Sequence, residues 1–212
     1  IIMSYAKLEE KLTKAKIKLM TKCVFISTIA LSLRHVISTA TPTADVNGIT
    51  ARYNPQYIDP LSVDELAGLV AHETWHVAFQ HLSRRMARDP MIWNVAADYV
   101  IDTMLIGDGY QVPNPLLDSK YDKKWTTEAI YDDLMKTAKP PPKNMRLDIQ
   151  GPDDGGSAID SPIVDIIVRA KTQATMSSKG IGHLPDEVIR RIDELINPKL
   201  PWPVILNRFL DQ

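Results

Sequence analysis

Residues 62–79 of this 212-residue chain read SVDELAGLVAHETWHVAF. The segment opens with Ser62 and has Glu65 three residues later, which is the pairing of a capping box, so we expect a helix to begin at Ser62. The apolar residues that follow recur at helical spacing and continue through Phe79. The second half of this helix is therefore expected to lie in the protein core.

Residues 72–76 of that helix have the pattern H-E-x-x-H. His72 and His76 stand one helical turn apart on one face, so both imidazoles can bind a single metal ion. Glu73 can reach a water molecule that the metal activates and can act on it as a general base. The pattern predicts a zinc-dependent hydrolase. We favour this over a chance pairing of two core histidines, because a surface pair would more often lie among charged residues.

A second helix is predicted to begin at Asp89, an N-cap residue followed by a first-turn proline, and to end near Ile106. Asp98 and Asp102 fall on the apolar stripe of this helix. Burying an unpaired carboxylate costs several kcal/mol, so acidic residues on a buried face usually have a metal, a cation or hydrogen-bond donors as partners. These two side chains are therefore candidate site residues.

Catalytic zinc usually has three protein ligands, and Asp98 is our first choice for the third. Asp102 would then accept a hydrogen bond from the free N–H of a ligand histidine, although the two aspartates could exchange roles. His81 follows His76 by five residues and can be a ligand only if the helix ends near Gln80. Asn94 is a weaker ligand for zinc, so we expect it to bond nearby backbone.

The remaining polar candidates are less specific. An oxyanion-stabilising group is needed, and Tyr53, Tyr99 and Arg84 are the alternatives, each of which can equally be a packing or surface residue. His35 and His183 lie outside any ligand spacing and are interpreted as structural or surface residues.

Composition excludes several classes of function. With 25 basic and 26 acidic residues, the net charge of −1 gives no basic footprint for nucleic acid or for an anionic membrane. The single cysteine, Cys23, excludes an internal disulfide and a cysteine-rich zinc site, and it favours a cytoplasmic location. Residues 4–37 are predicted to form one or two packed helices rather than a secretory signal, and their apolar run is too short to cross a bilayer.

The rest of the chain divides by composition. Apolar and polar side chains alternate over residues 49–53, which follow an Asn-Gly turn. We therefore expect an edge strand beside the motif helix, and an extended peptide could pair with this strand. Residues 1–137 form the predicted core with both site helices, 138–160 a flexible Pro- and Gly-rich loop, and 161–212 a C-terminal helical part of the same domain. Further helices are predicted over residues 127–136, 161–178 and 185–196 and from residue 203.

Two segments together carry a family resemblance. Residues 70–85, which contain the H-E-x-x-H motif, and residues 93–101, WNVAADYVI, resemble a metallopeptidase domain found in front of von Willebrand factor A-like domains in bacterial and phage proteins. Residues 41–54 and 197–202 are similar to that family's flanking segments. The resemblance implies a zincin-like fold, with the motif residues and Asp98 at the site, and a von Willebrand factor A-like partner domain. Asp102 departs from the family pattern, where an asparagine is expected.

The sequence therefore predicts an α+β, predominantly helical, zincin-like metallopeptidase domain with a small sheet beside the motif helix. We expect Zn²⁺ as cofactor and a peptide or protein as substrate, with no nucleic-acid or membrane partner. Two alternatives stay open. One is a non-catalytic metal-binding scaffold or partner-binding module, which would have no need of Glu73; the other is a metal-dependent hydrolase of non-peptide amides, which would use the same residues.

Overall fold

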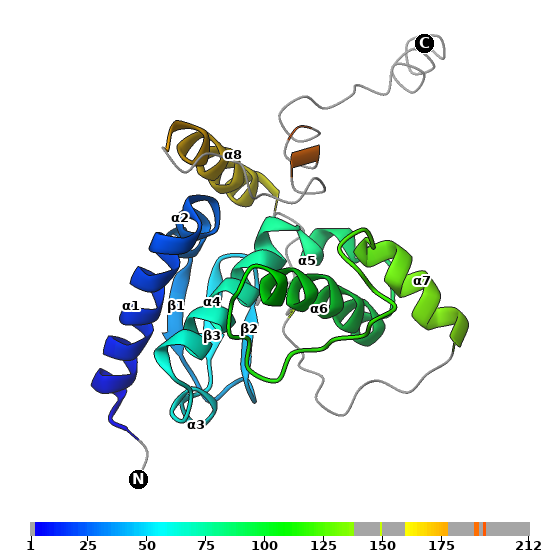
Figure 1. The fold of residues 1–212 in the computed structure, drawn as a ribbon. Coiled ribbons are helices and arrows are strands. Elements are labelled where there is room, and N and C mark those ends of the chain that lie inside the picture. Colours follow the sequence, from blue (N-terminus) through cyan, green and yellow to red (C-terminus); the bar gives the residue numbers. More distant parts are fainter. Residues whose placement is uncertain (1–2, 138–148, 150–159, 178–188, 191–192, 194–212) are drawn as a thin grey trace, which may run out of the picture.

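A computed structural model describes residues 3–137, 149, 160–177, 189–190 and 193 of the chain. The described part is α+β, mostly helical with one small mixed sheet, which confirms the predicted fold class (Figure 1). Its elements are α1 (Tyr5–Lys22), α2 (Val24–Ser32), β1 (Arg34–Ile37), β2 (Ala44–Val46), β3 (Thr50–Tyr53), α3 (Pro55–Ile58), α4 (Val63–Ala78), α5 (His81–Arg84), α6 (Pro90–Gly107), α7 (Thr127–Thr137) and α8 (Asp160–Met176).

The N-terminal region differs from its prediction in one respect. Helix α1 buries Leu8, Leu12, Ala15 and Leu19, a stripe at three- and four-residue spacing, as its periodicity indicates. The extended backbone at Cys23 separates α1 from α2. The predicted helical region reached residue 37, and this was wrong, because residues 34–37 form β1. Val36 and Ile37 continue the apolar residues of the preceding helix, so periodicity did not show that the helix ends before residue 34.

The strand order in the sheet is β1-β3-β2. Strand β3 pairs in parallel with β1 and antiparallel with β2, and Ala51 lies between His35 and Val46. A strand over residues 50–53 was predicted correctly, but its prediction as an edge strand was wrong, since β3 is central. The described outer strand next to the motif helix is β2, for which the sequence analysis made no strand prediction.

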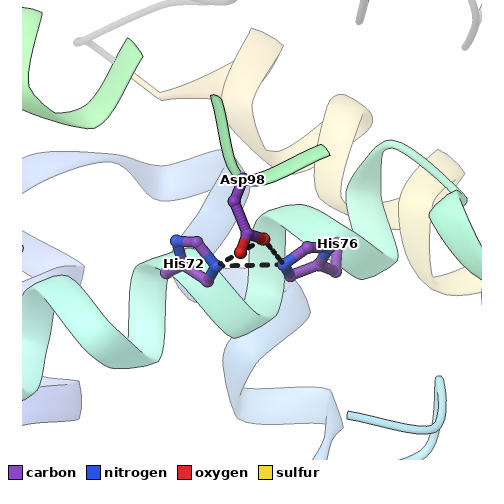
Figure 2. A group of neighbouring side chains, drawn as sticks. All are labelled: His72, His76 and Asp98. Carbon is purple, nitrogen blue, oxygen red and sulfur yellow. Dashed lines mark hydrogen bonds and ion pairs between the residues drawn. The ribbon is translucent and has the colours of Figure 1, made fainter. Parts of the chain in front are cut away.

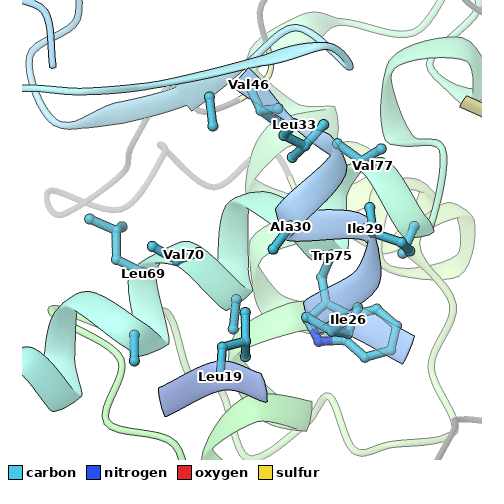
Figure 3. Packing of buried hydrophobic residues seen from close by; sticks show 14 of the residues in the cluster. Leu19, Ile26, Ile29, Ala30, Leu33, Val46, Leu69, Val70, Trp75 and Val77 are labelled. Carbon is cyan, nitrogen blue, oxygen red and sulfur yellow. The ribbon is translucent and has the colours of Figure 1, made fainter. Parts of the chain in front are cut away.

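Helix α4, which carries the H-E-x-x-H motif, runs through the main hydrophobic core. The predicted capping box is present, with Ser62 Oγ accepting from the Glu65 backbone and the Glu65 carboxylate accepting from the Ser62 backbone. Every residue from 66 to 79 is buried, because α1, α2, α6 and β2 surround the helix. Figure 3 shows Leu69, Val70, Trp75 and Val77 of this segment among side chains of α1, α2 and the sheet.

Gly68 allows a loop to approach this helix closely. A Cβ atom at residue 68 would overlap the backbone carbonyl of Gln111, whose carbon would lie 2.8 Å away. In a helix interior, alanine is normally more stable than glycine by about 1 kcal/mol. Here we expect Gly68→Ala to lower the free energy of unfolding by about 1–3 kcal/mol, because overpacking against backbone cannot be relieved by a rotamer change. Denaturant unfolding measures the effect.

Gly107→Ala is the matched control for that substitution. A Cβ at residue 107 would meet only the end of the Lys123 side chain, which can move aside. We expect its free energy of unfolding to stay within about 0.5 kcal/mol of the native value. If the two variants had equal free energies of unfolding, the close approach of the Gln111 backbone would not require glycine at residue 68.

Three further helices complete the described fold. Asp89 Oδ1 accepts from the Met91 and Ile92 backbone amides, which confirms the predicted start of α6. Helix α7 packs against α6 around a second apolar cluster, and α8 packs against α2. Within the described residues no helix is long and apolar enough to cross a membrane. The predicted flexible loop, apart from Ile149 and Asp160, and the predicted helices after residue 178, apart from residues 189–190 and 193, lie outside the described residues.

Candidate metal centre

Helices α4 and α6 bring three ligand-type side chains to one point. His72 and His76 project from successive turns of α4, and Asp98 projects toward both from α6 (Figure 2). All three side chains are fully buried. They form a group that can hold a metal ion, with one ligand atom from each lying within 4.8 Å of the others. The sequence named these three residues as the ligand set, and the fold places them together.

The donor atoms fit a divalent metal in spacing and in chemistry. His72 Nε2 lies 3.0 Å from His76 Nε2, and Asp98 Oδ1 lies 3.4 Å and 3.3 Å from these two nitrogens. In a tetrahedral zinc site with bonds of about 2.0–2.1 Å, ligand atoms lie about 3.3 Å apart. Two imidazoles and a carboxylate also form the donor set of one class of catalytic zinc sites. These three donor atoms form a triangle, and their separations need to change by only a few tenths of an ångström to hold zinc.

Asp102 lies one turn beyond Asp98 and contacts the opposite side of the first histidine. Its Oδ1 is 2.8 Å from His72 Nδ1, and its Oδ2 accepts from the Leu116 backbone amide at 2.7 Å. A carboxylate in this position accepts the Nδ1 proton, which leaves the Nε2 lone pair of His72 directed at the triangle. The structure thus places Asp102 where a carboxylate can fix the tautomer of a ligand.

His81 lies on the far side of the second histidine. Its Nδ1 is 3.1 Å from His76 Nδ1, and its Nε2 is 3.0 Å from Thr127 Oγ1. Helix α4 does end before Gln80, which was the condition for His81 to act as a ligand. The ring nevertheless faces the nitrogen of His76 that points away from the triangle, and His81 is not part of the three-residue group.

Asn94 connects the triangle to the outer strand of the sheet. Its amide donates to Asp98 Oδ2 at 3.2 Å, and its Oδ1 accepts from the Ile149 backbone amide at 3.1 Å. Ile149 in turn forms a parallel bridge with Val46 of β2. The expected backbone contact of Asn94 is present, and the side chain also orients the carboxylate of Asp98.

Glu73 directly follows His72 on α4, is fully buried, and acts through its charge on Tyr53 of β3. Burial, and after it the charge of Glu73, raises the pKa of Tyr53 well above its ordinary value, so the Tyr53 hydroxyl stays protonated. That hydroxyl lies 3.1 Å from His35 Nδ1, and His35 Nε2 lies 2.7 Å from the carbonyl of Ala30. Because a carbonyl only accepts, His35 carries its proton on Nε2 and accepts from Tyr53. Burial also lowers the pKa of His35, which favours this neutral form.

All three candidates for oxyanion stabilisation have contacts elsewhere, and for Tyr53 this is the hydrogen bond from its hydroxyl to His35. Arg84 donates to both carboxylate oxygens of Glu128 and to the carbonyl of Phe79. Tyr99 lies 5.0 Å from Tyr121 between ring centroids and belongs to the α6–α7 cluster. Of the three candidates, Tyr53 is the one whose pKa is raised by the charge of Glu73, after the larger effect of burial.

Sequence reasoning missed one residue of this region and named no partner for another. Thr127, the first residue of α7, is fully buried against His81, and His35 supports Tyr53. Thr127 had no signal, because a threonine at a helix start is ordinary. His35 was interpreted as a structural or surface residue, and in the structure it makes a structural contact with the Tyr53 hydroxyl.

Comparison with known proteins agrees with the geometry. No curated protein and no solved structure matches the chain. A family model described as "Putative metallopeptidase domain" matches residues 7–158, which include all of the triangle, Glu73 and Asp102. Because this match covers most of the chain, the chain belongs to that metallopeptidase-domain family.

Proposed function

We propose that this domain is a zinc-dependent metallopeptidase that hydrolyses peptide bonds with Glu73 as general base. The observation that carries the proposal is the buried triangle of His72, His76 and Asp98, with a buried glutamate next to the first histidine on the same helix. A purely structural zinc site has no use for such a glutamate, and placing it in the core costs free energy. Family membership supports the same reading.

In the proposed reaction each side chain has one task. His72 and His76 would hold the ion through Nε2, and Asp98 through Oδ1. A zinc ion held there would polarise the substrate carbonyl and lower the pKa of a water molecule toward about 7. Glu73 would accept a proton from a water molecule as the water oxygen attacks the carbonyl carbon of the substrate. Glu73 then delivers the proton to the amide nitrogen as the C–N bond breaks.

The sheet supports a peptide as the proposed substrate. Strand β2 is an outer strand next to α4, and Val46 already pairs with the backbone of Ile149, which Asn94 ties to Asp98. An extended peptide is the ligand that such a strand edge accepts, through main-chain hydrogen bonds. Because Ile149 already occupies this edge at Val46, we propose that the substrate backbone pairs with the rest of the β2 edge, at Ala44 and Asp45, in place of the β3 edge expected from sequence.

Metal analysis together with a cleavage assay tests the proposal. We expect purified protein to contain about one zinc per chain, as measured by atomic emission, and to cleave a denatured, fluorophore-labelled protein. Dialysis against a chelator should remove both the zinc and the cleavage, and added Zn²⁺ should restore them, because the donor set alone holds the ion. A parallel assay on small non-peptide amides distinguishes peptide hydrolysis from general amide hydrolysis. Cleavage that survives complete zinc removal would contradict the proposal.

A further inference from the structure

His81 reaches the site because the motif helix is interrupted. Helix α4 ends at Ala78, and Gln80 adopts a left-handed conformation with φ 55° and ψ 39° before α5 begins at His81. On a continuous helix, His81 would be rotated about 140° from His76. After the interruption the two rings face each other, with centroids 5.2 Å apart and the planes at 67°. A left-handed residue other than glycine is uncommon, so the surrounding contacts must maintain it.

The proton positions follow from the partners of each nitrogen. His76 Nε2 faces Asp98 and His72, and it must offer a lone pair there to bind an ion. The proton of neutral His76 is then on Nδ1, which lies 3.1 Å from His81 Nδ1. His81 Nδ1 must accept it, so His81 carries its own proton on Nε2. That proton has an acceptor, since a threonine hydroxyl oxygen stands 3.0 Å away at Thr127.

Several contacts hold the His81 ring in this orientation. The side chain is fully buried and lies 5.4 Å from Phe79 and 6.0 Å from Trp93, measured between ring centroids. Trp93 Nε1 also donates to the backbone carbonyl of His81 at 2.8 Å. The ion pair between Arg84 and Glu128, at 2.7 Å, connects α5 to the first turn of α7, where Thr127 lies. Both the ring and its acceptor are therefore parts of the packed core.

We propose that His81 is a positioning residue for His76, and that Thr127 in turn fixes the tautomer of His81. The inference rests on the proposed metal role of His72, His76 and Asp98. In this arrangement both ligand histidines have a buried acceptor on Nδ1: the carboxylate of Asp102 for His72, and the neutral imidazole of His81 for His76. Acceptors of this kind keep the Nε2 lone pair directed at the ion and raise metal affinity.

Zinc affinity of three variants tests the inference. We measure it by competition with a chromophoric chelator on the full chain. His81→Phe keeps an aromatic ring but removes the acceptor, and we expect zinc to bind about 10–100-fold more weakly. His81→Asn places an acceptor oxygen near the position of Nδ1 and should recover most of the affinity. Thr127→Val removes the acceptor for Nε2–H, and we expect a smaller weakening of about threefold to tenfold.

Thr74→Val is the matched control for Thr127→Val. Thr74 is equally buried, and its hydroxyl donates to the Val70 carbonyl within α4 rather than to a histidine. We expect its zinc affinity to equal that of the unaltered protein. The visible spectrum of the Co²⁺-substituted protein, which reports on ligand geometry, should change in His81→Phe and remain unchanged in Thr74→Val.

The outcomes separate the inference from the proposed function. If the unaltered protein binds no zinc, both are overturned. If it binds zinc and His81→Phe binds zinc equally well, the inference alone is overturned. Complete loss of zinc in His81→Phe without recovery in His81→Asn would identify His81 as a ligand, which also overturns it. Should His81→Phe fail to fold, equal affinity of Thr127→Val and Thr74→Val would overturn the inference.

Discussion

Replacing Asp98 with asparagine is expected to remove stoichiometric zinc from the domain. Asp98 Oδ1 supplies the anionic corner of the triangle, 3.4 Å and 3.3 Å from the Nε2 atoms of His72 and His76. An amide oxygen is a much weaker zinc ligand than a carboxylate, and two histidines alone leave the ion with too few protein ligands. We expect affinity to fall by more than about 100-fold, beyond the effect of losing an outer hydrogen bond. Atomic emission and chelator competition measure the change.

Asp45→Asn provides the matched control, because Asp45 is also a buried carboxylate. Its oxygens accept from Arg52 at 2.7 Å and 3.3 Å, within the β2–β3 pair and outside the metal group. Removing this charge should destabilise the sheet and leave zinc affinity unchanged. If Asp98→Asn retained full zinc affinity, Asp98 would not be the third ligand, and Asp102 or His81 would have to take that place.

The two helices that carry the candidate site could be predicted from local chemistry. The capping box at Ser62 and the N-cap at Asp89 mark their starts, and both are present in the structure. Carboxylates on an apolar stripe are costly to bury, so Asp98 and Asp102 stood out before any geometry was known. Such signals lie within a few residues of each other, which is why they can be read from sequence.

The sheet was predicted less well, because its pairing is not local. The Asn47-Gly48 turn is visible in the sequence, and Gly48 has φ 91°, but β2 before it is only three residues long. Strand β1 pairs directly and in parallel with β3, although β2 lies between them in the sequence, and no residue near 34–37 indicates that contact. The central position of β3 follows from these two pairings, so it could not be seen from β3 itself.

The role of His81 could not be predicted from the sequence, for a different reason. Its role depends on the left-handed conformation of Gln80, and glutamine is not a residue that signals such a backbone. Its acceptor, Thr127, is 46 residues away. The sequence showed that ligation by His81 required a helix end near Gln80; it could not show that the resulting ring would contact the outer nitrogen of His76.

Replacing Glu73 with glutamine is expected to abolish peptide hydrolysis while the domain keeps its zinc. Glutamine matches the shape of glutamate but cannot accept a proton from the attacking water, and general acid–base catalysis is worth about 10²–10⁴-fold in rate. None of the three donor atoms changes, so zinc affinity should stay within about threefold. Cleavage of the labelled denatured protein and chelator competition are measured on the same sample.

Glu65→Gln is the matched control, because it makes the same substitution on the same helix. Glu65 accepts from the Ser62 backbone amide at 2.7 Å in the capping box, a position that glutamine also occupies well. This variant should keep both zinc and activity. If Glu73→Gln cleaved as fast as Glu65→Gln, Glu73 would not be the general base. If both variants and the unaltered protein bound zinc and none cleaved, the metal would be structural, and the free-energy cost of burying Glu73 would need another explanation, for which its interaction with Tyr53 is the first place to look.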